Sequence, residues 1–153
     1  PNTSISYGEI YAIYLILKEY DKLFNKYKDD YVLILHSDSA YCVQAITKWV
    51  FGWKKAARNG RWIKSDGKEV AYQELFKEIF DIVYNKGYHI FIKHISGHID
   101  ISNSKHICKA VKRYKRFNSE EITIEELKYF TFCNDLCDRR AKDILDLGLK
   151  GRV

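Results

Sequence analysis

The sequence predicts a single α/β domain over residues 1–153, because segments of helical period alternate with compact aliphatic runs that are typical of strands. The order helix, strand, helix, helix, strand, helix implies parallel strands joined by helical crossovers. No repeat and no linker divides the chain. The composition, with 46% hydrophobic and 15% aromatic residues, is globular and excludes a disordered chain.

Apolar residues at intervals of three and four define the expected helices. These are expected at residues 8–27, 39–57, 71–85, 120–128 and 135–147. In the first helix, Ile10, Ile13 and Leu17 share one face. Ser6 is its expected N-cap, and Glu9, three residues later, is the capping-box partner.

Two strands are expected, at 31–36 and 88–93. The first is a run of aliphatic and β-branched residues, which predicts a strand that is buried on both faces. A two-stranded sheet is marginal by itself, so the fold needs more strands than this sequence shows.

The charge balance points to a polyanionic partner. The chain has 26 Lys and Arg against 20 Asp and Glu, which gives a formal net charge of +6. No apolar stretch is long enough to span a membrane. The four cysteines, Cys42, Cys108, Cys133 and Cys137, are too sparse for a disulfide scaffold and too irregularly spaced for a zinc site with His106. We therefore expect free thiols in a reducing intracellular compartment, the cytoplasm or the nucleus.

Three carboxylates suggest a reaction. Asp38 directly follows the first predicted strand, at the strand end where open α/β sheets place their sites. Glu9 lies in the first helix and Asp138 in the last. Carboxylates that gather near a strand end favour a bound cation, and Mg²⁺ prefers oxygen ligands and bridges phosphates. The pattern suggests metal-assisted phosphodiester hydrolysis, although solvated surface acids are the default interpretation.

Six motifs, in one order along the chain, resemble the type 1 ribonuclease H family. They are Ser4-Ile-Ser-Tyr-Gly-Glu9, His36-Ser-Asp38-Ser39-Ala-Tyr41, Gln44-Ala-Ile-Thr-Lys-Trp49-Val-Phe-Gly-Trp53-Lys54-Lys55, Trp62-Ile-Lys64-Ser-Asp-Gly67-Lys68-Glu-Val70, Lys93-His-Ile-Ser-Gly97-His98 and Asn134-Asp-Leu-Cys137-Asp138-Arg-Arg-Ala141. The resemblance implies a ribonuclease H-like mixed sheet with helices on both faces. It implies a metal-dependent endonuclease, which hydrolyses the RNA strand of RNA–DNA hybrids with two Mg²⁺ or Mn²⁺ ions. We expect a monomer whose partner is the hybrid.

The resemblance also assigns roles to residues. Glu9, Asp38 and Asp138 match three of the family's four metal-binding carboxylates, with Asp135 as the fallback for Asp138. His98 matches a histidine that assists proton transfer or product release, which makes it a fourth catalytic residue. The structural alternatives are a helix N-cap for Asp38, a capping box for Glu9 and a first-turn helix acid for Asp138.

Further residues match the family's contacts with the substrate, many of them in a basic protrusion at about 53–70. The expected substrate-binding residues are Ser4, Ser6, Ser39, Gln44, Trp49, Trp53, Lys54, Lys55, Trp62, Lys64 and Asn134. Mixed indoles and cations suit a nucleic-acid backbone, because rings pack on sugars while cations neutralise phosphates. Trp49 is equally compatible with a core position, whereas Trp53 and Trp62 are expected on the protrusion.

Departures from the family pattern keep other functions open. The family's first aspartate has no counterpart, and we expect its three N-terminal strands to lie on a separate segment or a longer polypeptide. A basic insertion at about 101–132 is either a solvated helix face or a second nucleic-acid contact. The alternatives are a catalytically impaired module that binds hybrid or RNA, and a related metal nuclease acting on branched or structured nucleic acid.

Overall fold

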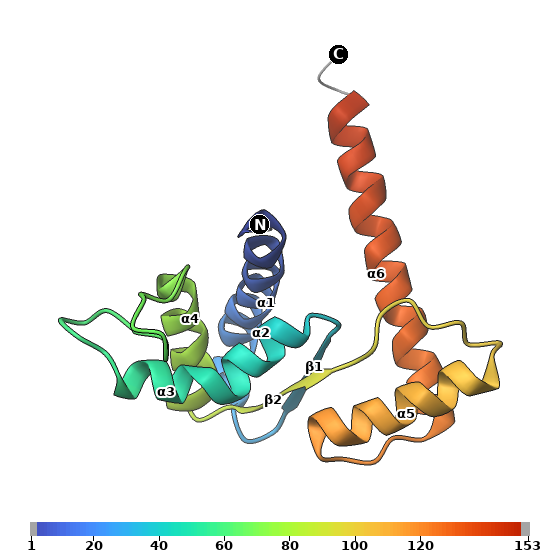
Figure 1. Cartoon of the computed structure of the whole chain (residues 1–153), viewed down its shortest axis with the longest axis horizontal. Coiled ribbons are helices and arrows are strands. Elements are labelled where there is room, and N and C mark those ends of the chain that lie inside the picture. Colours follow the sequence, from blue (N-terminus) through green and yellow to red (C-terminus); the bar gives the residue numbers. More distant parts are fainter. Residues whose placement is uncertain (1–2, 151–153) are drawn as a thin grey trace. The chain divides into compact units, whose positions relative to one another are not determined.

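Helices and strands follow one another in the computed structural model in the predicted order (Figure 1). The structure describes the backbone of residues 3–150 and the side chains of residues 6–143 and 146. The elements are α1 (Thr3–Phe24), β1 (Val32–Ser37), α2 (Ala40–Gln44), α3 (Val50–Lys55), α4 (Gln73–Phe80), β2 (His89–His94), α5 (Ser104–Asn118) and α6 (Ile124–Lys150). The predicted α/β class is confirmed. Among the described helices, none has both the length and the apolar character that crossing a membrane requires.

The two strands pair in a small sheet. The backbone N–H of Ile95, just after β2, donates to the carbonyl of Ser37 at the end of β1 (3.0 Å), so both strands end at the same edge and run parallel. The expectation that the first strand is buried on both faces is wrong. Successive side chains of a strand point to opposite faces, and β1 buries Leu35 while Val32 and Ile34 are 59% and 50% exposed.

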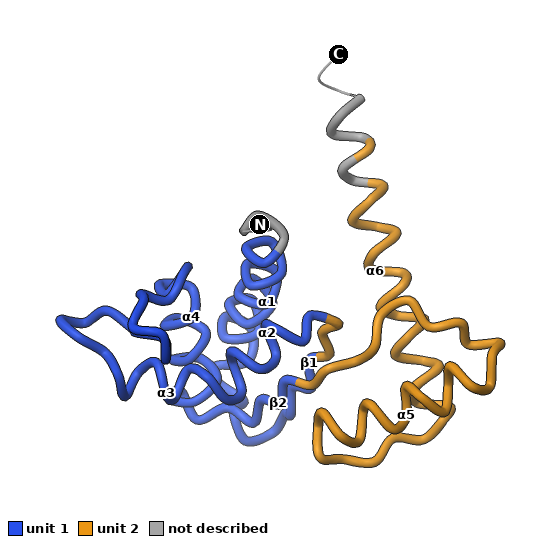
Figure 2. The backbone as a smooth tube through the Cα atoms, viewed as in Figure 1, with its two compact units in different colours: residues 1–35, 39–92 blue, residues 36–38, 93–153 orange. Residues whose placement is uncertain are grey.

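The chain divides into two compact units, which Figure 2 shows in different colours. Unit 1 comprises Pro1–Leu35 and Ser39–Ile92, and it contains the predicted protrusion. In this unit α1 packs against α2 and α4. Side chains that are completely buried form its core: Ile10, Leu17, Ile46, Val50, Phe76 and Ile79.

Unit 2 comprises His36–Asp38 and Lys93–Val153, and it contains the predicted insertion. Here α5 packs against α6, and the core consists of Ile95, Ile107, Ala110, Tyr114, Ile122 and Leu127. The side chain of Asn118, at the end of α5, accepts a hydrogen bond from the backbone N–H of His94 and donates one to its carbonyl (both 2.8 Å). It therefore satisfies the backbone at the end of β2 as a neighbouring strand would.

Two helix boundaries differ from the prediction. Because α1 begins at Thr3, Ser6 lies inside the helix, and the predicted N-cap with its Glu9 partner is wrong. The helices predicted at 120–128 and 135–147 are one helix, α6. The residues between them include no glycine or proline that would end a helix, so the helical hydrogen bonds continue through them.

A partly buried ionic cluster links α1 to the segment before β2 in unit 1. Lys86 Nζ lies 2.6 Å from Asp21 Oδ2, and the Tyr88 hydroxyl donates to Asp21 Oδ1 (2.5 Å). Burial by itself would raise the pKa of Asp21, but the hydrogen bonds from Lys86 and Tyr88 outweigh it and hold that pKa below its ordinary value. The charged form of Asp21 therefore stabilises the fold.

We predict that Asp21→Asn lowers the free energy of unfolding at pH 7 by about 1–3 kcal/mol, because one of the two donors loses its acceptor. A group whose pKa falls on folding contributes stability above its unfolded pKa and loses it as the pH falls. The difference from the wild type should therefore shrink as the pH falls below the ordinary aspartate pKa of about 3.9, in urea denaturation measured from pH 7 downward. Asp30→Asn, on an exposed aspartate, is the control. An equal difference at every pH would contradict the ionic origin.

Candidate functional site

Asp38 is the first residue after β1, and two contacts in unit 2 restrict its carboxylate. The side-chain amide of Asn134, on α6, donates to Asp38 Oδ2 (3.2 Å). Gly97 lies in the loop after β2, where a Cβ atom would be only 2.7 Å from the same oxygen. A residue with no side chain is required for such a close approach. The ends of the two strands thus place Asp38 and this loop together, as expected for a parallel sheet.

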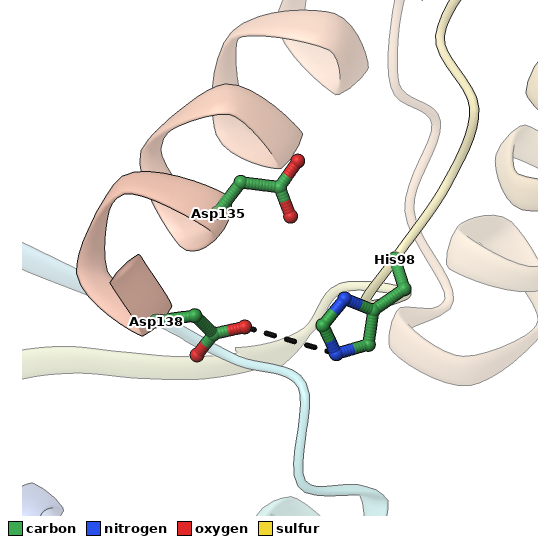
Figure 3. A group of neighbouring side chains, drawn as sticks. All are labelled: His98, Asp135 and Asp138. Atoms are coloured by element: carbon green, nitrogen blue, oxygen red, sulfur yellow. Dashed lines mark ion pairs between the residues drawn. The ribbon is translucent and has the colours of Figure 1, made fainter. Parts of the chain in front are cut away.

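The residue after Gly97 is His98, whose backbone adopts the left-handed conformation (φ +52°) that is uncommon for residues other than glycine. Its side chain is 83% exposed, and its Nε2 lies 3.9 Å from Asp138 Oδ2 on α6 (Figure 3). Asp135, one turn earlier on α6, completes a group of three whose ligand atoms all lie within 4.8 Å of one another. A cavity of about 240 Å³ opens beside them.

The donors of this group fit a divalent cation that prefers oxygen. Mg²⁺ binds oxygen at about 2.0–2.1 Å, so two oxygens on one ion lie at most about 4.2 Å apart. The 4.8 Å spread is slightly wider, and a small rotation of the Asp135 or Asp138 side chain would close the difference. Mg²⁺ favours carboxylate over imidazole ligands, so the chemistry of His98 suits proton transfer better than ligation.

Four of the residues that the sequence predicts at the site lie in unit 2. They are Asp38, His98, Asn134 and Asp138. Among the described residues, the group that could hold a metal joins Asp138 to His98 and Asp135, the predicted fallback, and does not include Asp38 or Glu9. Glu9 belongs to unit 1, on α1.

The carboxylate of Glu9 lies beside a buried thiol. Glu9 Oε2 lies 4.0 Å from the sulfur of Cys42, on α2. Burial raises the pKa of the Cys42 thiol, the hydrogen bond with Ser39 lowers it, and the Glu9 carboxylate raises it again, to about 11 in all. The thiol therefore stays protonated at neutral pH, so it adds no second negative charge beside Glu9.

Sequence reasoning missed His94, which lies beneath the site at the end of β2. Its side chain is almost fully buried and stacks on Phe117, with ring centroids 4.4 Å apart. Burial and the charge of Arg113 lower the pKa of His94, against the opposing effect of a hydrogen bond with the Asp38 backbone and of the Asp38 charge. The neutral ring therefore connects the Asp38 backbone to α5. The sequence offers no signal for this role, because the partners come from the insertion.

A cleft of about 570 Å³ in unit 1 is lined by aromatic and basic side chains. Its lining consists of Tyr41, Lys48, Trp49, Gly52, Trp53, Ala56, Ile63, Lys64 and Ser65. The ring of Trp49 contacts those of Tyr41 and Trp53, at centroid distances of 5.7 and 6.1 Å. Aromatic faces beside lysines suit a sugar–phosphate backbone, so three of the predicted substrate-binding residues share a surface of the expected chemistry.

The exposure of the tryptophans differs from the expectation. Trp49, which was equally compatible with the core, is 39% exposed in the cleft, whereas Trp53 and Trp62 are only 8% and 6% exposed. The backbone N–H of Trp62 donates to the buried Gln73 side chain (2.9 Å), and its ring meets that of Phe80 edge-on. Trp62 thus anchors the protrusion to α4. This burial was not predicted, because helical spacing alone does not show which face of a segment is covered.

The remaining predicted substrate-binding residues also belong to unit 1. They are Ser4, Ser6, Ser39, Gln44, Lys54 and Lys55. Ser39 caps α2 by accepting a hydrogen bond from the backbone N–H of Cys42 (3.3 Å). Lys54 Nζ lies over the ring of Phe80, 4.5 Å from its centroid. The side chain of Ser4 lies outside the described residues.

Comparison with known proteins relates this chain to one family. The family model described as RNase H matches residues 1–114. Ribonuclease HI of Pasteurella multocida is 32% identical over 108 residues, which are 69% of this chain and 62% of that protein. Ribonuclease H1 of Mus musculus is 42% identical over 66 residues, which are 43% of this chain and 21% of that protein.

The chain therefore spans less than two thirds of the length of these relatives. The family match ends before α6, so Asn134 and Asp138 lie beyond it. No solved structure matches this chain.

We predict that Gly97→Ala separates the loop from Asp38, because the added Cβ would overlap the carboxylate oxygen. The overlap should cost about 1–3 kcal/mol of stability and shift the NMR resonances of the Asn134 side-chain amide, which is hydrogen-bonded to Asp38. Gly8→Ala is the matched control, because a Cβ there meets nothing within 4 Å. Unchanged Asn134 resonances in Gly97→Ala would show that the approach is looser than described.

Proposed function

We propose that this chain, which belongs to the ribonuclease H family, hydrolyses the RNA strand of RNA–DNA hybrids with the help of bound divalent ions. The observation that carries the proposal is the meeting of Asp38, Asn134 and the His98 loop at the ends of two parallel strands. This is where a fold of this class places its chemistry. The carboxylates Asp135 and Asp138 extend the same site along α6.

Each residue has a distinct task in the proposed reaction. Divalent ions, when bound, would activate a water molecule and stabilise the negative charge that develops on the leaving 3′ oxygen. Asp38 and Asp138, with Asp135, would hold these ions. Asn134 orients Asp38 by donating to one of its oxygens, which leaves the other free to bind. His98, which is exposed on its loop, would deliver a proton to the leaving oxygen.

The cleft of unit 1 supports a hybrid as the substrate. It presents the exposed Trp49 between Tyr41 and the basic side chains Lys48 and Lys64. We infer that the DNA strand lies here, with its sugars on the indole and its phosphates near the lysines. Binding of this kind is independent of sequence, because neither contact reads a base edge.

We predict that Asp38→Asn and Asp138→Asn each lower hydrolysis of a hybrid with a labelled RNA strand by at least about 100-fold in Mg²⁺, because each removes a charge that holds the ions. The protein is assayed in its full native reading frame. Asp143→Asn, an exposed aspartate further along α6, is the matched control and should keep full activity. If Asp38→Asn cleaves as fast as the wild type, the catalytic assignment is wrong.

The same assay separates the alternative functions. Cleavage of hybrid in preference to double-stranded RNA and junction DNA supports the proposal. Preferred cleavage of junction DNA would indicate a nuclease for branched substrates. Metal-independent binding of hybrid with no cleavage of any substrate would indicate a binding module, and either result would overturn the proposal.

We predict that Trp49→Ala combined with Lys64→Gln weakens binding of a hybrid about tenfold or more and reduces its salt dependence, because a stacking surface and a cation are lost together. The measurement is fluorescence anisotropy over a salt series, in Ca²⁺. Tyr27→Ala combined with Lys26→Gln removes one aromatic ring and one cation from another exposed part of unit 1 and is the control. Equal weakening by both pairs would contradict a specific role for the cleft.

A further inference from the structure

One face of α5 is strongly cationic. The helix has no acidic residue, and its Lys and Arg side chains, except Lys115, recur at helical spacing on one side: Lys105, Lys109, Lys112, Arg113 and Arg116. We refer to these five as the basic face. The buried residues of α5 are Ile107, Ala110 and Tyr114, which face the core of unit 2. The packing of α5 therefore turns the basic face away from the core of unit 2.

Part of this face lines a pocket beside the candidate active site. The pocket, of about 220 Å³, is formed by the loop 96–99 together with His106, Lys109, Ala110 and Arg113 of α5. His98 belongs both to this pocket and to the cavity of Asp135 and Asp138. The cationic pocket and the cavity lined by Asp135, Asp138 and Arg139 therefore adjoin at a single side chain, His98, within unit 2.

The two lysine and arginine cations of the pocket lack an ion-pair partner within the described part of the chain. Lys109 and Arg113, one helical turn apart, form no ion pair with a described carboxylate. The acidic residues that follow α5, Glu120 and Glu121, pair instead with Lys93 and Lys115, and Asp100, which precedes the helix, accepts hydrogen bonds from Ser102. Like charges held together in a concave site attract an anion, and the guanidinium of arginine matches the geometry of a phosphate.

We propose that this pocket binds a backbone phosphate of the nucleic acid, next to the phosphodiester that is cleaved. The inference rests on the proposed function: if the reacting phosphate lies at Asp138, His98 lies beside it and also borders the pocket, so a neighbouring phosphate of the strand is close to the pocket. Lys109 and Arg113 hold the phosphate, with His106 beside them. The predicted insertion thereby adds a contact with the nucleic acid next to the cleaved phosphodiester, in addition to the aromatic cleft of unit 1.

The first test measures affinity. Binding of a fluorescent RNA–DNA hybrid is followed over a salt series in Ca²⁺, so that turnover plays no part. Lys109→Gln combined with Arg113→Gln should weaken binding about tenfold at low salt and lower the slope of log K against log salt by about 1–2. Lys26→Gln combined with Lys115→Gln removes the same net charge outside the pocket and should have little effect. Equal losses in the two pairs would overturn the proposal.

The second test locates the phosphate. Hybrids that carry one neutral methylphosphonate linkage at successive positions are bound to each protein. For the wild type, one linkage close to the cleavage position should weaken binding several-fold, and the same linkage should have no effect on the Lys109→Gln, Arg113→Gln protein. Lys109→Arg combined with Arg113→Lys should keep the wild-type pattern, which separates charge from folding. If no linkage couples to the pair, the pocket does not bind a phosphate.

The two proposals fail separately. A wild-type protein that shows the coupled linkage but does not hydrolyse the hybrid would overturn the proposed function and support the pocket. A protein that hydrolyses the hybrid without any coupled linkage would support the function and overturn the pocket.

Discussion

The loop after β2 passes so close to the end of β1 that Gly97 has no room for a side chain beside Asp38. The other features of the candidate site follow from this approach. Because the strands are parallel, their ends share one edge, and the loop that leaves β2 meets the aspartate that follows β1. The next residue in that loop, His98, turns back in a left-handed conformation and faces Asp138. Asn134 completes the arrangement from α6 by holding Asp38 from another direction.

The insertion also has a structural role. Asn118 pairs with both backbone groups of His94, Phe117 stacks on the His94 ring, and the Tyr114 hydroxyl lies 3.2 Å from Nε2 of His36. The polar contacts among these satisfy hydrogen-bonding groups at the ends of both strands. Without α5, those groups would be buried without partners or exposed to water. Removing α5 would therefore disturb the strand ends that carry Asp38 and the His98 loop. The cations of α5 therefore lie on a helix that also supports the strand ends at the candidate site.

The sequence predicted which elements carry the candidate site residues better than it predicted the burial around them. Motif spacing placed Asp38, His98 and Asp138 at strand ends and on a helix, and helical period located α1 and α4. The burial of Trp62 and the exposure of Ile34 were not predictable, because a hydrophobic period identifies a face but not what covers it. The capping pattern at Ser6 failed for a related reason, since a local signal for a helix start does not prevent the preceding residues from joining the helix.

The distribution of charge around His98 reconciles two demands on a nuclease. Asp135 and Asp138 repel a phosphodiester, and one pair of like charges 4 Å apart costs about 4 kcal/mol at an effective dielectric constant of 20. Divalent ions, when bound, would reverse this repulsion at the reacting phosphate. Cations close to the acids, but not paired with them, attract the strand without neutralising the carboxylates. In the described structure, the cavity lined by Asp135, Asp138 and Arg139 of α6 meets the pocket of Lys109 and Arg113 of α5 at His98.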